Sequence, residues 1–387
     1  MKVAADKGWV VEKFINGTLV DNYAGFAPVP INEDNFPDPN FRKFVAAKAI
    51  NANEDGFLSE EELKAVTKMD VNSKEITSLK GIDFFMALTE LDCRYNNLTS
   101  LDVSKKTALK KLDCSNNSLT SLDVSKNTAL EWLGCDNNSL TSLDVSKNTA
   151  LWSLSCYRNS LESLDLSQNT ELTYIACGYN SLGALDLSHN TKLWTLYCNN
   201  CGLSSLDISG NTRINTLICD DNNLMTLDVS KNTWLQSINC GGNLLTSLDF
   251  TNNTNLDGLT CEGDQIRGDN MTNLVNSLPE AFNGKMYVCS DRVNPDNVIT
   301  AAQVKVANDK GWKVIKFLGN GMSEYAGLGD VNGDNKIDHD DLDLIVKIIM
   351  GKKPGDVGDY AGDLNMDGKT DARDVVIMVN ILKSLGK

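Results

Sequence analysis

One 21-residue unit, repeated with small variations between residues 88 and 266, constrains the fold more than any other feature. Its clearest copy is LKKLDCSNNSLTSLDVSKNTA, residues 109–129. Leucine or isoleucine falls five and two residues before a cysteine in each unit, and again five residues after it. Each unit has an apolar face that only a neighbouring unit can cover, so the period predicts a solenoid. The cysteines that mark the period are Cys93, Cys114, Cys135, Cys156, Cys177, Cys198, Cys219, Cys240 and Cys261.

Two polar positions recur with the same period. An asparagine three residues after the cysteine can bond backbone groups of the turn and stack into a ladder; Cys201 and Asp264 replace it in two units. An aspartate in the LDVSKNT segment is expected to cap the following turn, which is a structural role. The asparagines are Asn96, Asn117, Asn138, Asn159, Asn180, Asn222 and Asn243. The aspartates are Asp102, Asp123, Asp144, Asp165, Asp186, Asp207, Asp228 and Asp249.

The pattern LxxLxCxxNxL resembles the leucine-rich repeat. A 21-residue unit with cysteine in the strand is most similar to the cysteine-ladder, internalin-like proteins of bacterial surfaces. This resemblance implies an α+β solenoid with short parallel strands and an irregular convex side. Cysteines stacked side by side in one direction have poor geometry for disulfides. We therefore expect them to be reduced and buried as small apolar side chains.

The first residues resemble a segment near the other end of the chain. MKVAADKGWVVEKF (1–14) nearly repeats KVANDKGWKVIKF (305–317), and NYAG (22–25) resembles EYAG (324–327). The later copy follows the repeats, so it is expected to close the solenoid. The earlier copy then predicts a remnant of a preceding solenoid, in a chain that is a fragment of a longer protein. Residues 1–14 have no apolar signal-peptide core.

A helical segment with an EF-hand-like loop precedes the repeats. The loop spans residues 51–62, with Gly56 at the sharp turn and Glu62 at the closing position. Asparagine instead of aspartate at the first position removes one charge, and a loop that only turns the chain is the alternative. The candidate calcium ligands are Asn51, Asn53, Asp55, Phe57, Ser59 and Glu62.

Two further calcium-loop patterns lie near the C-terminus, in DVNGDNKIDHDD and DLNMDGKTDARD. Each precedes an apolar helical segment, without a helix before the loop. Duplicated loops of this kind, closed by aspartate, resemble a type I dockerin, although Asn335 stands where glycine is usual and Thr370 where an apolar residue is usual. The predicted calcium ligands are Asp330, Asn332, Asp334, Lys336, Asp338, Asp341, Asp363, Asn365, Asp367, Lys369, Asp371 and Asp374, the lysines through their carbonyl groups.

The dockerin resemblance implies a partner and a cofactor. Calcium folds the domain, which then docks onto a cohesin-type scaffold domain. The positions that recognise the partner correspond to His339 and Asp340 in one loop, and to Ala372 and Arg373 in the other. The two pairs differ in chemistry, which disfavours symmetric binding in two orientations.

Five segments are expected from these patterns. They are a solenoid remnant and linker at 1–28, a helical N-terminal cap at 29–87, the repeats at 88–268, a C-terminal cap at 269–327 and an all-α dockerin at 328–387.

Composition and motifs disfavour several function classes. A net charge of −16 argues against nucleic acid or an anionic membrane as a partner, and no apolar run approaches the ~20 residues of a membrane span. The two histidines, His189 and His339, lack a nucleophile at a recognisable spacing. We therefore expect no enzyme activity. We also expect a monomer located outside the cell or at its surface.

Aromatic residues gather on four consecutive repeats. The outward strand positions lie three and one residues before each cysteine and one after it, with rim positions four before and two after. Large rings there alternate with small residues such as Gly134, Ser155, Ala176 and Gly178, which predicts grooves and a ligand site. The alternative is that aromatics simply favour strands. The candidate ligand-binding residues are Trp132, Trp152, Tyr157, Tyr174, Tyr179, Trp194 and Tyr197.

Three functions therefore compete. The first is an extracellular binding module whose concave face captures a protein or glycan and whose dockerin provides the tether. The second is a structural spacer, and the third is an accessory subunit of a polysaccharide-degrading, cellulosome-like complex. A spacer predicts interchangeable outward residues, whereas the localised aromatic residues favour the binding module.

Overall fold

The computed structural model describes residues 13–15, 18–20, 27–290, 297–318, 321–332, 334, 336–352, 362–364 and 369–386. The chain divides into two compact units, residues 1–151 and 152–387. The five segments expected from the sequence remain a prediction.

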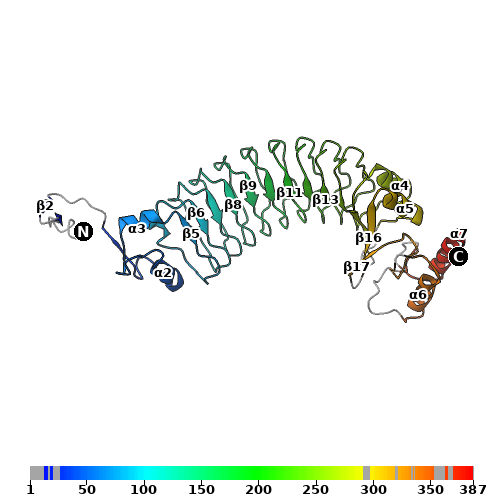
Figure 1. The fold of residues 1–387 in the computed structure, drawn as a ribbon, viewed down its shortest axis with the longest axis horizontal. Coiled ribbons are helices and arrows are strands. Elements are labelled where there is room, and N and C mark those ends of the chain that lie inside the picture. The colour runs from blue at the N-terminus through cyan, green and yellow to red at the C-terminus, as the bar shows by residue number, and fades with distance from the viewer. Residues whose placement is uncertain are drawn as a thin grey trace. The chain divides into compact units, whose positions relative to one another are not determined.

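The N-terminal cap has two short helices that lie near the first strands of unit 1 (Figure 1). Helix α2 (Pro39–Val45) begins at Asp38, whose Oδ1 accepts the N–H groups of Asn40 and Phe41. Its Oδ2 accepts the N–H and hydroxyl of Thr77, both at 2.7 Å, which joins the helix to the chain entering the repeats. Strand β3 (Val29–Pro30) pairs with β4 (Phe57–Leu58) in the cap, and before it β1 (Lys13–Ile15) and β2 (Thr18–Val20) pair with each other. Helix α3 (Glu60–Ala65) and the 3-10 helix η1 (Ile82–Phe84) complete this cap.

Each repeat contributes one three-residue strand that ends immediately before its cysteine. In unit 1, β5 to β8 pair in parallel in chain order, and in unit 2 so do β9 to β16. The strands are β5 (Lys68–Asp70), β6 (Glu90–Asp92), β7 (Lys111–Asp113), β8 (Trp132–Gly134), β9 (Ser153–Ser155), β10 (Tyr174–Ala176), β11 (Thr195–Tyr197), β12 (Thr216–Ile218), β13 (Ser237–Asn239) and β14 (Gly258–Thr260).

The predicted register is confirmed by burial. In the repeat around Cys114, the inward residues Leu109, Leu112, Cys114 and Leu119 are all 0% exposed. All of the chain's cysteines are buried and reduced, including Cys201 and Cys289 outside the period. Burial raises the pKa of the Cys240 thiol well above its usual value, so this ladder thiol is a protonated apolar side chain rather than a reactive group.

The predicted asparagine ladder is present. Nδ2 of Asn117 donates to the carbonyl oxygens of Cys93 and Cys114, both at 3.0 Å, while its Oδ1 accepts the N–H of Leu98. Where the ladder ends at Asp264, the C-terminal cap supplies the missing amide: Nδ2 of Asn297 donates to the carbonyl of Cys261. Asn297 of the cap therefore takes the place of a repeat asparagine, and the ladder continues into the cap.

A second, fully buried asparagine ladder was not predicted. Asn127 in the LDVSKNT segment is 0% exposed, and its Nδ2 donates to the carbonyls of Val103 and Lys106, both at 2.9 Å. The same pair of bonds recurs along the repeats. It is made by Asn148, Asn190, Asn211, Asn232 and Asn253, and Asn169 at the same position of its repeat is also 0% exposed.

The predicted aspartate caps are confirmed and lie at the surface. Oδ1 of Asp207 accepts the N–H of Ser209 at 2.9 Å, and the bonds from the backbone and side chain of Ser209 lower the Asp207 pKa. The same cap closes the other repeats. A negative charge on each aspartate is therefore compatible with the fold.

Lys106 occupies the first position of the buried asparagine ladder. It is 0% exposed, and its Nζ donates to the carbonyl of Phe85 at 3.1 Å, in place of an asparagine amide. Burial lowers its pKa to about 8, despite the nearby Asp83, which pairs with Lys105 at 2.6 Å. A lysine whose folded-state pKa is lowered binds fewer protons when folded, so its unfavourable effect on folding weakens as pH rises from about 8 towards 10.5.

Replacing Lys106 with the ladder residue, Lys106→Asn, should therefore stabilise the protein more at pH 7 than at pH 9.5. The stability advantage of the variant should shrink over that interval by roughly 2 kcal/mol. Urea unfolding of both proteins at each pH measures the difference in their free energies of unfolding. The titration of other groups affects both proteins equally and cancels in this difference. The exposed neighbour substitution Lys105→Asn is the control. An advantage that does not change with pH would show that Lys106 is not buried as a charge.

The C-terminal cap confirms the two predicted strand-like segments and adds helices that were not predicted. Strands β15 (Gly284–Ser290) and β16 (Trp312–Leu318) continue the parallel sheet of unit 2, and β17 (Gly321–Glu324) pairs antiparallel with β16. Helices α4 (Gly268–Ser277) and α5 (Ala301–Asp309) lie beside these strands (Figure 1).

The C-terminal segment folds into two helices, as predicted for an all-α domain. Helix α6 (His339–Ile349) and helix α7 (Ala372–Ser384) each follow one of the acidic loops. Their small shared core consists of Val331, Ile337, Leu344, Ile345, Leu364, Met378 and Leu382. Among the described residues, no helix has the length and apolar character needed to cross a membrane.

Candidate functional site

The candidate aromatic residues of unit 2 lie in three groups on and around the strands. Tyr174 and Tyr197 lie on neighbouring strands β10 and β11, with ring centroids 5.8 Å apart. Tyr157 and Tyr179 lie just beyond the strand ends, 5.1 Å apart. At the opposite rim Trp152 and Trp194 are 47% and 43% exposed. The remaining candidate, Trp132, lies on β8 of unit 1.

The rings cover the small residues instead of standing beside open grooves. A Cβ atom added at Gly178 would lie 3.0 Å from the ring of Tyr157 and 2.4 Å from Oδ1 of Asn199. At Gly134 it would lie 2.5 Å from the ring of Trp132. The expected grooves are thus filled by the rings at these two positions. Glycine is needed there because a Cβ atom would lie too close to the ring of Trp132 at Gly134 and to Oδ1 of Asn199 at Gly178.

The residue two positions after each cysteine of the period has a left-handed backbone conformation. Tyr179 has φ 54° and Arg158 also has φ 54°, in the left-handed region that disfavours side chains other than asparagine and aspartate. Tyr95 has the same conformation in the first repeat. The rim side chains Arg158 and Tyr179 are therefore presented by a strained backbone.

Three residues that join the aromatic groups were not predicted. The guanidinium of Arg158 lies 5.0 Å from the ring centroid of Tyr179 and 5.6 Å from that of Tyr157. Trp234 is 57% exposed, with its ring 6.2 Å from that of Trp194. Trp234 lies six residues before its cysteine, outside the positions considered, and only the ring contact brings it to the site. In unit 1, the Lys111 ammonium lies 5.0 Å from the Trp132 ring.

The strand face of unit 1 is charged instead of aromatic before Trp132. Arg94 pairs with Asp92 at 2.7 Å and with Asp113 at 3.2 Å. Lys68 pairs with Glu90 at 2.7 Å on the preceding strands. These ion pairs satisfy one another, so this part of the face offers few free charges to a ligand.

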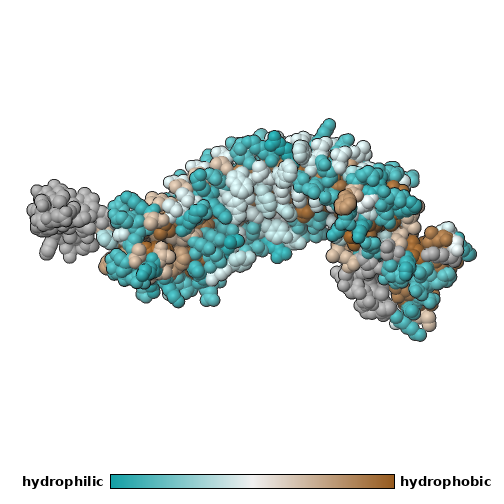
Figure 2. Space-filling model, in the orientation of Figure 1, coloured by the Kyte–Doolittle hydropathy of each residue, from teal (hydrophilic) through white to brown (hydrophobic). Residues whose placement is uncertain are grey.

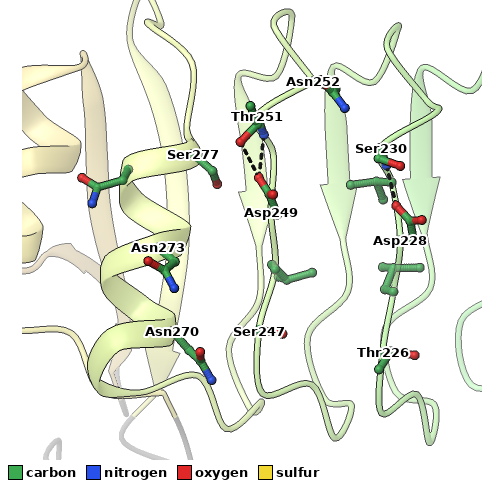
Figure 3. A pocket seen from close by; sticks show the side chains of 14 residues that line it. Thr226, Asp228, Ser230, Ser247, Asp249, Thr251, Asn252, Asn270, Asn273 and Ser277 are labelled. Carbon is green, nitrogen blue, oxygen red and sulfur yellow. Dashed lines mark hydrogen bonds between the residues drawn. The ribbon is translucent and has the colours of Figure 1, made fainter.

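A polar groove lies on another side of unit 2, between helix α4 and the last repeats (Figure 3). Its volume is about 750 Å³. Asn270, Asn273 and Asn276 line it from the helix, opposite the caps at Asp228 and Asp249. The groove has no aromatic lining residue, and its aspartates are already engaged by Ser230 and Thr251. We therefore rank it below the aromatic groups as a recognition site.

The first C-terminal loop is organised by its closing aspartate. Oδ1 of Asp341 accepts the N–H groups of Val331 and Asn332, and Oδ2 accepts that of Asp338 at 2.8 Å. Asp338 in turn caps helix α6. In the second loop Asp374 binds the N–H groups of Leu364 and Asp371 in the same way. Asn365 and Asp367 lie outside the described residues.

The donors of the first loop fit a calcium ion. Asp330 is 1% exposed, and its Oδ1 has no hydrogen-bond partner among the described residues. Burial raises the Asp330 pKa to about 6, so the carboxylate needs a cation to be charged at low cost. Among the described residues, no three acidic, histidine or cysteine side chains form a ready metal cluster. In such loops asparagine and backbone carbonyl oxygens complete the donor set.

Calcium would be held by the predicted donors of each loop. In the first, these include the side chains of Asn332 and Asp334 and the carbonyl of Lys336, and in the second Asp363 and the carbonyl of Lys369. The ion would supply positive charge to otherwise repelling carboxylates. Asp363 is buried, as its counterpart Asp330 is.

The predicted partner-recognition residues all lie at the first turn of a helix. His339 and Asp340 begin α6, Ala372 and Arg373 begin α7, and all four are exposed. The Arg373 guanidinium pairs with Asp371 at 2.7 Å. Apolar side chains are also exposed on these helices, where Figure 2 shows brown surface. They are Val346, Ile349, Met350 and Val376.

Comparison with known proteins separates the chain into two parts. Residues 328–383 match the sequence model of the Dockerin type I domain. Internalin J of Listeria monocytogenes is 42% identical over 74 residues, which are 19% of this chain and 8% of that protein. This chain therefore aligns with only a small part of that relative.

Solved structures show the fold of the repeats. An internalin (InlF) of Listeria monocytogenes aligns with a TM-score of 0.61 and 22% identity, over 74% of this chain and 86% of that one. Internalin C2 of the same species aligns with a TM-score of 0.50 and 19% identity, over 57% and 100%. The chain thus combines an internalin-like leucine-rich-repeat solenoid of the cysteine-ladder type with a C-terminal type I dockerin match, as predicted. Type I dockerins bind calcium, so the match also supports this cofactor in general.

Proposed function

We propose that this chain is a non-catalytic extracellular binding module. Its repeats capture a protein or glycan through the aromatic groups, and its C-terminal segment docks onto a cohesin-type scaffold when calcium is bound. The observation that carries the proposal is the concentration of exposed rings on a few repeats. Trp152, Trp194 and Trp234 are each 43–57% exposed, and exposed aromatic side chains are enriched at interfaces.

The arrangement of the rings supports a broad, flat contact. The rings of unit 2 form a platform, in which the ring of Tyr157 lies against Gly178 and Ser153 and Ser155 on β9 are only 3% and 8% exposed. Arg158 adds a positive charge between two tyrosines. Stacking on a sugar face or packing on a protein surface would both use such a platform.

Docking would use the exposed residues at the starts of α6 and α7. Arg373 is paired with Asp371, whereas His339 and Asp340 have no equivalent arginine in their loop. This difference supports one preferred orientation on the scaffold. Val346 and Ile349 on α6, and Met350 immediately after it, would supply apolar contact area.

The test is a binding screen with a panel of glycans and bacterial surface proteins against the full chain. The variant Tyr174→Ala/Tyr197→Ala/Trp194→Ala/Trp234→Ala should lose at least about tenfold in affinity, because aromatic anchors carry much of the binding energy of an interface. Phe282→Ala, which removes a fully exposed ring from the C-terminal cap, is the matched control. Equal binding by wild type and a folded four-residue variant would contradict the proposed site.

The dockerin match specifically favours the accessory-subunit alternative as well. If the full chain binds cohesin domains but no member of the panel, the chain is better described as a spacer or accessory subunit of a polysaccharide-degrading complex. The calcium-dependent docking arm is tested separately, with purified cohesins in calcium and in chelator. Binding in chelator would contradict calcium-dependent docking.

A further inference from the structure

The N-terminal cap contains a loop whose closing carboxylate accepts hydrogen bonds from two other residues of the loop. In residues 51–62, Oε1 of Glu62 accepts the N–H of Ala52 at 2.8 Å. Oε2 accepts the N–H of Ser59 at 2.8 Å and its hydroxyl at 3.0 Å. Glu62 thus bridges the second and ninth residues of the loop, while Ser59 caps helix α3.

This is the bonding pattern of the two C-terminal loops. In residues 330–341, the twelfth residue, Asp341, accepts the N–H of the second residue at 2.7 Å and that of the ninth at 2.8 Å. The ninth residue also caps the helix that follows, as in the N-terminal loop. The N-terminal loop is therefore folded as the dockerin loops are, although it lies in the other unit and outside the dockerin match.

A second observation points to a cation at this loop. Asn51, the first residue of the N-terminal loop, is 2% exposed, and its Oδ1 has no hydrogen-bond partner among the described residues. Asp330, the first residue of the dockerin loop, shows the same combination. A buried amide oxygen without a partner is unfavourable. Asn51 immediately precedes Ala52, whose N–H binds Glu62. The Asn51 side chain therefore begins next to the closing carboxylate.

The rest of the loop supplies oxygens and is held in place. Asp55 and Asn53 are exposed, and Oδ1 of Asp55 accepts the N–H of Phe57 at 2.8 Å. Gly56 has φ 82°, which gives the sharp turn. Its carbonyl accepts the N–H of Ile31 at 2.9 Å, next to the pairing of β3 with β4. The loop is therefore anchored to the cap on both sides.

We propose that residues 51–62 bind one calcium ion, a third site besides the two dockerin loops. The ligands are the side chains of Asn51, Asn53, Asp55 and Glu62 and the carbonyl of Phe57, with Ser59 at the ninth position. Oxygen-only donors in a twelve-residue loop suit calcium better than magnesium, which requires a smaller octahedral site. The ion would tie helices α2 and α3 and strand β4 into one cap.

The loop at 51–62 should bind calcium more weakly than the dockerin loop at 330–341. Its ligand positions carry two carboxylates, Asp55 and Glu62, whereas the loop at 330–341 carries four. Fewer charges lower calcium affinity. We therefore expect half-saturation at about 0.1–1 mM calcium, the range of extracellular modules.

Hydrogen exchange of the full chain, followed by mass spectrometry, distinguishes the sites by peptide. Raising calcium from chelator conditions to about 10 mM should slow exchange in peptides that cover 51–65, separately from those that cover 336–350. Magnesium at the same concentration should have little effect. The Asn51→Asp variant, which adds a charge at the first position, should shift the calcium midpoint at least about tenfold lower.

Glu62→Gln is the disabling variant, because glutamine keeps the helix cap but loses the charge. It should abolish the calcium response at 51–65 and leave that at 336–350 unchanged. Glu54→Gln, which removes an exposed carboxylate from the same loop at a non-ligand position, should leave both unchanged. No calcium response at 51–65 in wild type and Asn51→Asp, or a response that persists in Glu62→Gln, would overturn the proposal.

Discussion

Removing calcium from the full chain should unfold the C-terminal helices while the repeats stay folded. The two helices share only a small core of seven buried residues, which is too little to stabilise so short a segment alone. Its carboxylates would repel one another without the ion. Each site filled at a hundred times its Kd contributes about 2.7 kcal/mol, so two contribute roughly 5 kcal/mol.

Hydrogen exchange in calcium and in chelator measures this effect within the intact protein. Peptides from α6 and α7 should lose protection by at least about a hundredfold, whereas those from β11 to β13 should not change. Asp334→Asn should weaken the response because it changes a ligand. Asp343→Asn, an exposed aspartate on α6 outside the loop, should not. Helices that keep their protection in chelator would contradict a calcium-dependent fold.

Replacing one residue of the buried asparagine ladder should cost far more stability than replacing its surface neighbours. Asn211 is 1% exposed, and its Nδ2 donates to the carbonyls of Leu187 and Asn190 at 3.0 and 2.9 Å. The Asn211→Ala variant removes one of the two hydrogen bonds that each carbonyl accepts, leaving only those from the N–H groups of Asn190 and Leu193, and it opens a small cavity. We expect a loss of about 2–4 kcal/mol in the free energy of unfolding.

Urea unfolding followed by tryptophan fluorescence gives the comparison. Ser209→Ala changes a residue two positions away in the same segment. That substitution should have little effect, because the Asp207 carboxylate that binds its N–H is at the surface and the backbone bond remains. A loss below about 0.5 kcal/mol for Asn211→Ala would mean that the carbonyls find other partners and that the ladder is not a major source of stability.

The register of the solenoid could be predicted because its signal is periodic. Leucine and cysteine at fixed spacing identify the inward face, and the structure buries them as expected. The second asparagine ladder could not be distinguished from a surface turn. Asn127 and the aspartate Asp123 lie four residues apart in one polar segment, yet only the asparagine is buried, by the neighbouring repeats. Lys106 lies in the same kind of polar segment, so the sequence alone would assign it to the surface.

The candidate sites show a similar division. Spacing alone predicts the calcium loops, because their donors are close in the sequence. Spacing also placed the aromatic residues on the outward side of the strands. It could not predict that the rings of Trp132 and Tyr157 lie over glycines, or that Trp234 joins Trp194. Those contacts depend on side-chain conformations and on residues from different repeats.

The left-handed residue two positions after each cysteine has a consequence for protein engineering. Six of the nine repeats hold asparagine, aspartate or glycine there, and the other three hold Tyr95, Arg158 and Tyr179. An optimisation that replaces each repeat with the average of its siblings would choose asparagine or glycine and relieve the strain. It would produce a more stable solenoid while erasing Arg158 and Tyr179 from the rim. In this scaffold, repeats that depart from the consensus identify candidate recognition residues.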